Sequence, residues 1–188
     1  ALFVYRRPTL IRQTVEALQR NVLADRSDLI IFSDGPKNRN HIKSVQEVRK
    51  YIHTIDGFKT VSVIERESNL GLASSIIDGV TMVCNEYGRV IVVEDDIVTS
   101  PYFLLYMNQG LDTYKDEERV ISINGYTYPV SAKLPETYFI KSTDCWGWAT
   151  WKRGWDLFES DGTKLLNEII MKEQQKEFDF NDSVAYMK

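Results

Sequence analysis

The sequence has few of the residues that build disulfide frameworks and zinc sites. Its 188 residues include two cysteines, Cys84 and Cys145, and two histidines, His41 and His53. The cysteines form no CxxC pair and have no zinc-ligand spacing, which argues against a zinc module. We therefore expect two thiols without a disulfide, with Cys84 inside an apolar helix face. The histidines are expected to be exposed and away from the strand ends.

A long apolar run and an excess of positive charge are also missing. No stretch approaches the roughly 18 apolar residues of a membrane-spanning helix, and none has the pattern of a signal peptide. We expect no membrane span in this segment. The net charge is −4, so broad attraction to nucleic acid or to an anionic membrane is not expected. A site for an anionic ligand would need a metal ion or an isolated arginine.

The composition is sufficient for one folded domain. Hydrophobic residues make up 43% of the chain and charged residues 27%, which is ordinary for a globular protein. The length favours a single domain, 1–188. The chain opens in the apolar run "ALFVY" without a Met, so we expect a piece of a longer protein, truncated at the C-terminus. The compartment stays open; in a bacterium we would expect the cytoplasm or the inner membrane face.

Apolar runs of strand type alternate with segments whose apolar residues recur at helical spacing. The expected strands are 2–5, 29–33, 58–65, 90–93 and 119–125, with 137–141 as a candidate sixth. The expected helices begin at Pro8, Ile42, Leu72 and Ser100, and a polar helix covers 162–176. This order predicts an α/β fold with a mostly parallel central sheet and helices on both faces.

Polar residues follow each of the first four strands. They are Arg6 and Arg7, Asp34 and Gly35, Asn69 and Gly71, and Glu94, Asp95 and Asp96. Ligands of open α/β sheets bind at the carboxyl ends of the strands. These residues are therefore expected to converge on one edge of the sheet.

The stretch "RVIVVEDDIVT" concentrates three acids where a buried strand ends. Adjacent carboxylates repel each other, and desolvation increases the cost. A hard divalent cation prefers oxygen ligands and could neutralise a diphosphate leaving group. The alternative is an acidic loop placed favourably near a helix N-terminus. Phosphatases of the haloacid-dehalogenase type and phosphorelay receivers fit poorly, because their acids follow other strands.

Four motifs resemble those of GT-A fold (Rossmann-like, nucleotide-diphospho-sugar) glycosyltransferases, in register after successive strands. The segment "VIVVEDDIVTSPYFLLYM" looks like the DxD-bearing segment of the N-acetylglucosaminyltransferase I type, and "VYRRP", "SDG" and "DCWGWATW" fall in that family's order. "NLGLASSI" is also similar to a stretch of family 2 glycosyltransferases. The resemblance covers about residues 2–158.

The resemblance implies roles for individual residues. Asp96 would be the direct ligand of Mn²⁺ or Mg²⁺, while Asp95 and Glu94 would hold ribose hydroxyls. Asp34 would accept a hydrogen bond from the uracil imide, although Asp34-Gly35 is also an ordinary turn dipeptide. Arg6 would face the base or the phosphates, but the sequence does not decide whether Arg6 or Arg7 points inward.

Further candidates for the nucleotide-sugar site are less specific. Asn69 is a candidate that could equally well only shape its loop. The resemblance implies that the loop with Trp146, Gly147 and Trp148 lies beside the donor sugar and the acceptor. A spacing of three and four residues, typical of one face of a helix, separates Trp148, Trp151 and Trp155. We expect Trp151 and Trp155 to pack in the core.

The sequence thus predicts a metal-dependent, inverting glycosyltransferase that takes a UDP-sugar donor and a carbohydrate or glycoconjugate acceptor. The catalytic base would be Asp182 or a residue beyond the C-terminus. A sugar nucleotidyltransferase is the alternative enzyme, although "VYRRPTL" has no glycine-rich loop. A carbohydrate- or partner-binding domain without catalytic activity is the alternative from another class.

Overall fold

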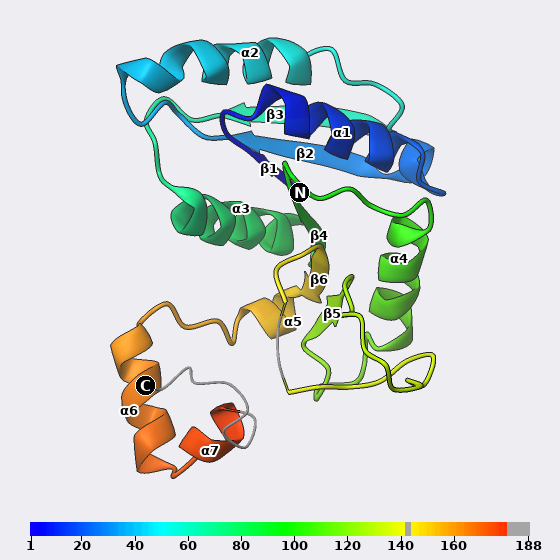
Figure 1. Ribbon diagram of the computed structural model, residues 1–188, viewed down its shortest axis with the longest axis vertical. Coiled ribbons are helices and arrows are strands. Elements are labelled where there is room, and N and C mark those ends of the chain that lie inside the picture. Colours follow the sequence, from blue (N-terminus) through cyan, green and yellow to red (C-terminus); the bar gives the residue numbers. More distant parts are fainter. Residues whose placement is uncertain (142–143, 180–188) are drawn as a thin grey trace. The chain divides into compact units, whose positions relative to one another are not determined.

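The computed structural model describes residues 1–141 and 144–179. The chain divides into two compact units, Ala1–Trp155 and Asp156–Lys188. Each unit is therefore described by itself (Figure 1). All of the predicted binding residues belong to the first unit, whereas Asp182, the candidate catalytic base, lies outside the described residues.

Strands and helices alternate through the first half of the chain, as predicted. The elements are β1 (Leu2–Val4), α1 (Pro8–Gln19), β2 (Asp28–Ser33), α2 (Ile42–Ile52), β3 (Thr60–Glu65), α3 (Leu72–Tyr87), β4 (Arg89–Glu94) and α4 (Phe103–Thr113), with short 3-10 helices η1 (Ala24–Arg26) and η2 (Arg39–His41). Pro8 begins α1, where its missing amide hydrogen costs nothing. Gly88 ends α3 in the left-handed conformation that glycine tolerates best.

The first unit contains one six-stranded mixed sheet. The strand order is β3-β2-β1-β4-β6-β5, where β5 is Ser122–Asn124 and β6 is Trp148–Trp151. Strands β1 to β4 pair in parallel, whereas β6 is antiparallel to both β4 and β5. The α/β class is confirmed, and the parallel part of the sheet is the part that the strand-helix alternation predicted.

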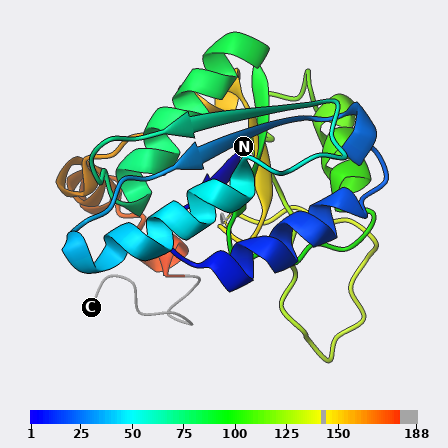
Figure 2. The ribbon, with the colours of Figure 1, turned by 90° about the horizontal axis from the view of Figure 1, so that it is seen from above.

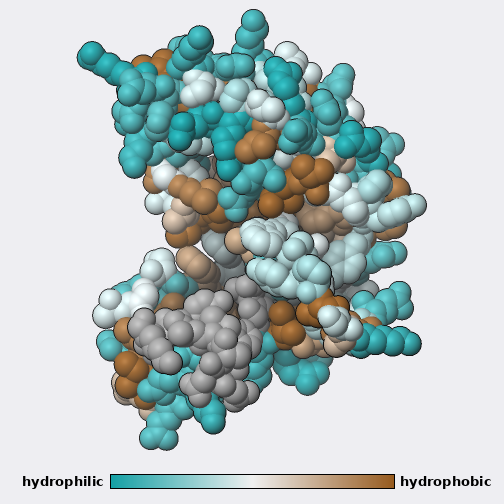
Figure 3. Space-filling view, viewed as in Figure 1, coloured by the Kyte–Doolittle hydropathy of each residue, from teal (hydrophilic) through white to brown (hydrophobic). Residues whose placement is uncertain are grey.

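Helices cover both faces of this sheet. In β1, Leu2 and Val4 join a core cluster with residues of α1, α2 and α4, while Phe3 joins a second cluster with residues of α3. Alternate residues of a strand point to opposite faces, so all of β1 is buried. Figure 2 shows α1 and α2 on one side of β2 and β3 and α3 on the other. The surface over α1 and α2, in the upper part of Figure 3, is mainly hydrophilic, as amphipathic helices require.

The tryptophan-rich segment folds differently from the prediction. No strand forms over 137–141, and the sixth strand is instead Trp148–Trp151, followed by the one-turn helix α5 (Lys152–Trp155). Residues three apart in a strand point to opposite faces. Accordingly, Trp151 is buried in the α4 cluster, while Trp148 packs in the α3 cluster with Trp155. The prediction of a helix over these tryptophans was wrong. The core position of Trp151 is confirmed, whereas Trp155 is partly buried and packs against the α3 cluster.

The second unit contains two short helices among its described residues. The predicted polar helix ends earlier than expected, because α6 covers Gly162–Met171 and α7 follows as Gln175–Phe178. Asp161 caps α6 by accepting hydrogen bonds from the amides of Thr163 and Lys164. Within the described residues, no helix is long and apolar enough to cross a membrane. Cys84 is buried in α3, and neither it nor Cys145 forms a disulfide, as expected.

Candidate functional site

The predicted acids lie at the point where the strand order reverses. The chain runs outward from β1 to β2 and β3, then returns to place β4 on the other side of β1. The carboxyl ends of β1 and β4 therefore open a crevice between them, which is the usual ligand position in such sheets. Residues Tyr5–Arg7 follow β1 and residues Glu94–Asp96 end β4, so both segments reach this crevice.

Arg7 joins the two aspartates of the acidic segment. Its Nη1 donates to Asp96 Oδ2 at 2.7 Å, and its Nη2 pairs with Asp95 Oδ1. Asp95 Oδ2 also accepts the backbone amide of Tyr5 at 3.3 Å. The side chain of Asp95 is only 3% exposed, whereas those of Arg7 and Asp96 are 44% and 41% exposed. Asp95 thus holds the arginine in place, and Asp96 stays accessible to a ligand.

Burial and mutual repulsion set the charge balance of these acids. Desolvation raises the pKa of Glu94, and the charges of Asp96 and Asp95 add to the effect. Desolvation also raises the pKa of Asp95 above its usual value, although the Arg7 guanidinium opposes it. Desolvation works against the Arg7 cation, but the hydrogen bonds and charges of Asp95 and Asp96 raise its pKa. The segment is therefore short of positive charge even with Arg7 in place.

The arginine at the acids is Arg7, not Arg6, which is exposed. The neighbouring Tyr5 hydroxyl instead meets His41 Nδ1 at 2.8 Å and accepts the amide of Lys37 at 2.9 Å. His41 is therefore close to the carboxyl end of β1, contrary to the expectation from the sequence. These hydrogen bonds of Tyr5 connect the loop after β2 to the end of β1.

Asp34 holds a loop together. Its buried carboxylate accepts four hydrogen bonds, at 2.7–3.0 Å, from the amides of Gly35, Leu70 and Gly71 and from Asn69 Nδ2. A carboxylate offers about four acceptor positions. All of them are engaged within the protein, so we assign Asp34 to loop structure rather than to the predicted uracil contact. Asn69, which also donates to the Gly35 carbonyl, has the same role.

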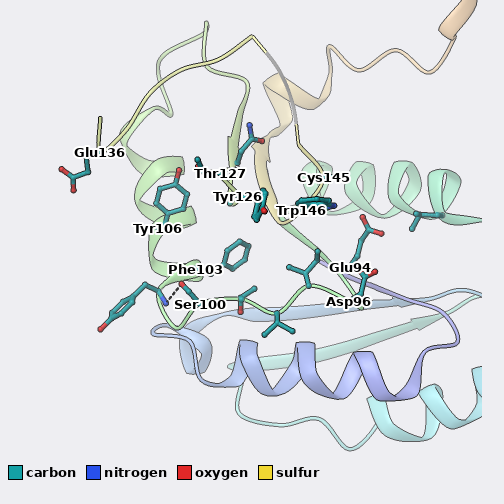
Figure 4. A pocket seen from close by; sticks show the side chains of 17 residues that line it. Glu94, Asp96, Ser100, Phe103, Tyr106, Tyr126, Thr127, Glu136, Cys145 and Trp146 are labelled. Atoms are coloured by element: carbon teal, nitrogen blue, oxygen red, sulfur yellow. Dashed lines mark hydrogen bonds between the residues drawn. The ribbon is translucent and has the colours of Figure 1, made fainter. Parts of the chain in front are cut away.

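A cavity of about 850 Å³ opens beside the acids. Glu94 and Asp96 lie at one end, and Tyr106 and Glu136 lie at the other (Figure 4). Tyr126 and Trp146 lie between the two ends in this view. The cavity therefore connects the acidic segment to a wall of aromatic side chains.

Two glycines place these aromatic residues next to each other. The Gly125 amide donates to the Gly147 carbonyl at 2.8 Å and closes the loop that runs between them. A Cβ at either position would lie within 2.9 Å of Cε2 of Phe103, and Gly147 has a φ of +77°. Trp148, on the other side of Gly147, does not line the cavity and packs against Trp155 instead. Trp146 thus lines the cavity, whereas Gly147 and Trp148 do not.

The donor atoms of the site fit a hard divalent cation. Asp96 is an exposed carboxylate, and Glu94 lines the same cavity. Mg²⁺ and Mn²⁺ are commonly held by one or two carboxylates, with phosphate oxygens and water completing the shell. The described residues contain no group of three or more His, Cys, Asp or Glu that could hold a metal by themselves. A cation here would therefore depend on a phosphate-bearing ligand.

Several residues of the cavity were not among the predicted ones. They are Tyr106, Asn124, Tyr126 and Glu136. For Tyr126 and Glu136, the signal available in the sequence was the long stretch between Gly125 and Gly147, in which only 137–141 has a strand pattern, because long loops in compact domains are commonly functional. No protein-family model matches the sequence, and no curated protein shows significant similarity to it.

Proposed function

We propose that the protein is a metal-dependent glycosyltransferase of the GT-A type that transfers a sugar from a UDP-sugar to an acceptor hydroxyl with inversion. The proposal rests on the position of the acidic segment, Glu94–Asp96, at the point where the strand order of the sheet reverses. There the segment faces Arg7. Ligands of open α/β sheets bind at this point. The resemblance of "VIVVEDDIVTSPYFLLYM" to the DxD-bearing segment supports the choice of a nucleotide sugar.

Each acidic residue then has its own task. Asp95 orients Arg7 through their ion pair and is itself held by the Tyr5 amide. Arg7 contacts Asp96 through Oδ2. Oδ1 of Asp96 has no hydrogen-bond partner among the described residues, so it is available to a cation. Glu94, half-buried in the cavity wall, accepts hydrogen bonds from sugar hydroxyls. The cation, when bound, supplies charge that stabilises the departing diphosphate.

An inverting transfer also needs a base that removes the proton of the acceptor hydroxyl. The resemblance implies an Asp that follows the Gly-Trp loop, and Asp182, the candidate by its order along the chain, lies outside the described residues. The described part of the chain therefore accounts for donor binding and for the shape of the cavity.

Calorimetry of UDP binding with and without Mn²⁺ tests the proposal. The parent protein should bind UDP measurably only with the cation. Asp96→Asn should lose the response to Mn²⁺ and bind UDP tenfold or more weakly, a cost on the order of 1.4 kcal/mol. Asp116→Asn is the matched control, because Asp116 is exposed in a turn outside the cavity.

A parent protein that binds no UDP in the presence of Mn²⁺ would overturn the proposal. Unchanged affinity and unchanged metal response in Asp96→Asn would remove Asp96 from the metal site.

A further inference from the structure

The cavity beside the acids is lined by acceptors of hydrogen bonds and by aromatic rings. Glu94, Asp96 and Glu136 contribute three carboxylates. Among the described residues that line the cavity, none is Lys, Arg or His. Away from a bound cation, these carboxylates repel a phosphate group. That part of the cavity therefore suits a ligand that is uncharged and rich in hydroxyl donors, because ionised carboxylates can only accept.

Tyr126 and Trp146, the aromatic residues in the middle of the cavity, already pack against each other and against Tyr128 without a ligand. The rings of Tyr126 and Trp146 meet edge to face, with centroids 4.7 Å apart and planes at 74°. Tyr128 packs on both, at 5.1 Å from Tyr126 and 5.6 Å from Trp146. The Trp146 amide donates to Asp144 Oδ1 at 2.8 Å, which fixes the turn that carries it. With its neighbours braced in this way, Trp146 needs little reordering to bind a ligand.

The indole of Trp146 is nevertheless open to a ligand. Trp146 is 44% exposed and Tyr126 is 40% exposed, although both pack against other rings. The face of an aromatic ring carries negative charge density. It attracts polarised C–H groups, and a pyranose ring presents several of these on one face and hydroxyls around its rim.

One wall residue has an unused hydrogen-bonding group. The side-chain oxygen of Asn124 is shielded from solvent and has no hydrogen-bond partner within the described part of the chain. Asn124 also lines the cavity. An unpaired buried acceptor is costly, and a ligand hydroxyl at this wall would supply the missing donor after a small rotation of the amide.

We propose that this cavity is a carbohydrate subsite in which a pyranose ring lies on Trp146, with its hydroxyls directed to Asn124 and the cavity carboxylates. Assigning the ring to the acceptor rests on the proposed function, which keeps the anionic donor diphosphate at Asp96. The acceptor ring then occupies the half of the cavity towards Tyr106 and Glu136, on the far side of Trp146 from the acids in Figure 4. The acceptor is thus a glycan, not a protein hydroxyl or a lipid.

Saturation-transfer NMR with methyl β-D-galactopyranoside and methyl β-D-glucopyranoside tests the subsite. The measurement is made in a chelator and without nucleotide, so that it is independent of UDP binding. At least one glycoside should bind and receive saturation mainly at the C–H protons of one ring face. Trp146→Ala should weaken glycoside binding about tenfold.

Tyr87→Ala is the matched control, since Tyr87 is an exposed aromatic residue at the end of α3 that does not line the cavity. Circular dichroism of both variants checks that they fold. Binding of neither glycoside, or equal binding by the parent protein and by Trp146→Ala, would overturn the subsite. Glycoside binding without any UDP binding would uphold the subsite and refute the transferase.

Discussion

The guanidinium of Arg7 lies 2.7 Å from Oδ2 of Asp96, across the crevice between β1 and β4. The same guanidinium pairs with Asp95, whose side chain is almost completely buried. One exposed and one buried carboxylate are therefore tied to a single cation. This arrangement leads to a first prediction about stability.

Replacing Arg7 with Gln should destabilise the first unit, because Asp95 would keep only its hydrogen bond from Tyr5. The loss should be on the order of 1–2 kcal/mol, below that of a fully buried pair because Arg7 is partly exposed. Urea unfolding measures it. Arg6→Gln removes the same charge one residue earlier, at an exposed position. Equal losses in the two variants would show that the ion pairs of Arg7 contribute nothing.

Asp34 should matter for stability more than for the choice of base. Asp34→Ala leaves the amides of Leu70 and Gly71 and the side chain of Asn69 without their shared acceptor. We expect a loss of about 2–4 kcal/mol, because several partly buried donors lose their partner together. Asp116→Ala, at an exposed turn position, should change stability little. A stable Asp34→Ala that no longer prefers UDP over CDP would instead restore the uracil contact.

The hydrogen bond between Gly125 and Gly147 closes the long loop, and a side chain at Gly147 should destabilise the protein. Gly147→Ala combines a φ of +77° with a Cβ 2.9 Å from Phe103. Gly88→Ala has a similar φ of +74° with nothing within 4 Å of the added atom, so it isolates the backbone strain of about 1 kcal/mol. Gly147→Ala should cost about 1–3 kcal/mol more and weaken glycoside binding. Equal thermal stability of the two variants would contradict the close packing of Gly147 against Phe103.

Glu94 should make stability depend on pH in a defined direction. Because its pKa is raised in the folded protein, the unfolded chain ionises first as pH rises, and stability falls through the window between the usual and the raised pKa. Glu94→Gln should therefore be more stable than the parent at about pH 7, and the difference should vanish near pH 4. Glu118→Gln, at an exposed position, should show no such trend. A difference that is the same at both pH values would refute the assignment.

The sequence predicts the part of the fold in which local pattern and topology agree. From β1 to α4, apolar periodicity marks each element, and the polar residues after the strands indicate one edge. The segment Trp148–Trp151 was misassigned because residues three apart suit one face of a helix and opposite faces of a strand equally well. Only the partner strands β4 and β5 decide between these alternatives.

The candidate site shows the same limit. The sequence indicates that Asp95 and Asp96 lie at a strand end, but the choice between Arg6 and Arg7 depends on how the chain turns after β1. The role of Asp34 depends on partners that lie 35–37 residues away. Tyr126 and Trp146 become neighbours only through the hydrogen bond between Gly125 and Gly147. Contacts of this kind leave no local pattern.

Paramagnetic broadening by Mn²⁺ in the presence of UDP tests the central claim most directly, because it locates the cation and the nucleotide together. In amide-resolved NMR spectra, the account predicts that signals of Arg7, Asp95, Asp96 and Ile97 broaden only when UDP and Mn²⁺ are both present. Mg²⁺ in place of Mn²⁺ should leave them sharp. Broadening centred away from the crevice between β1 and β4, or bound UDP without any broadening at Asp96, would contradict the account.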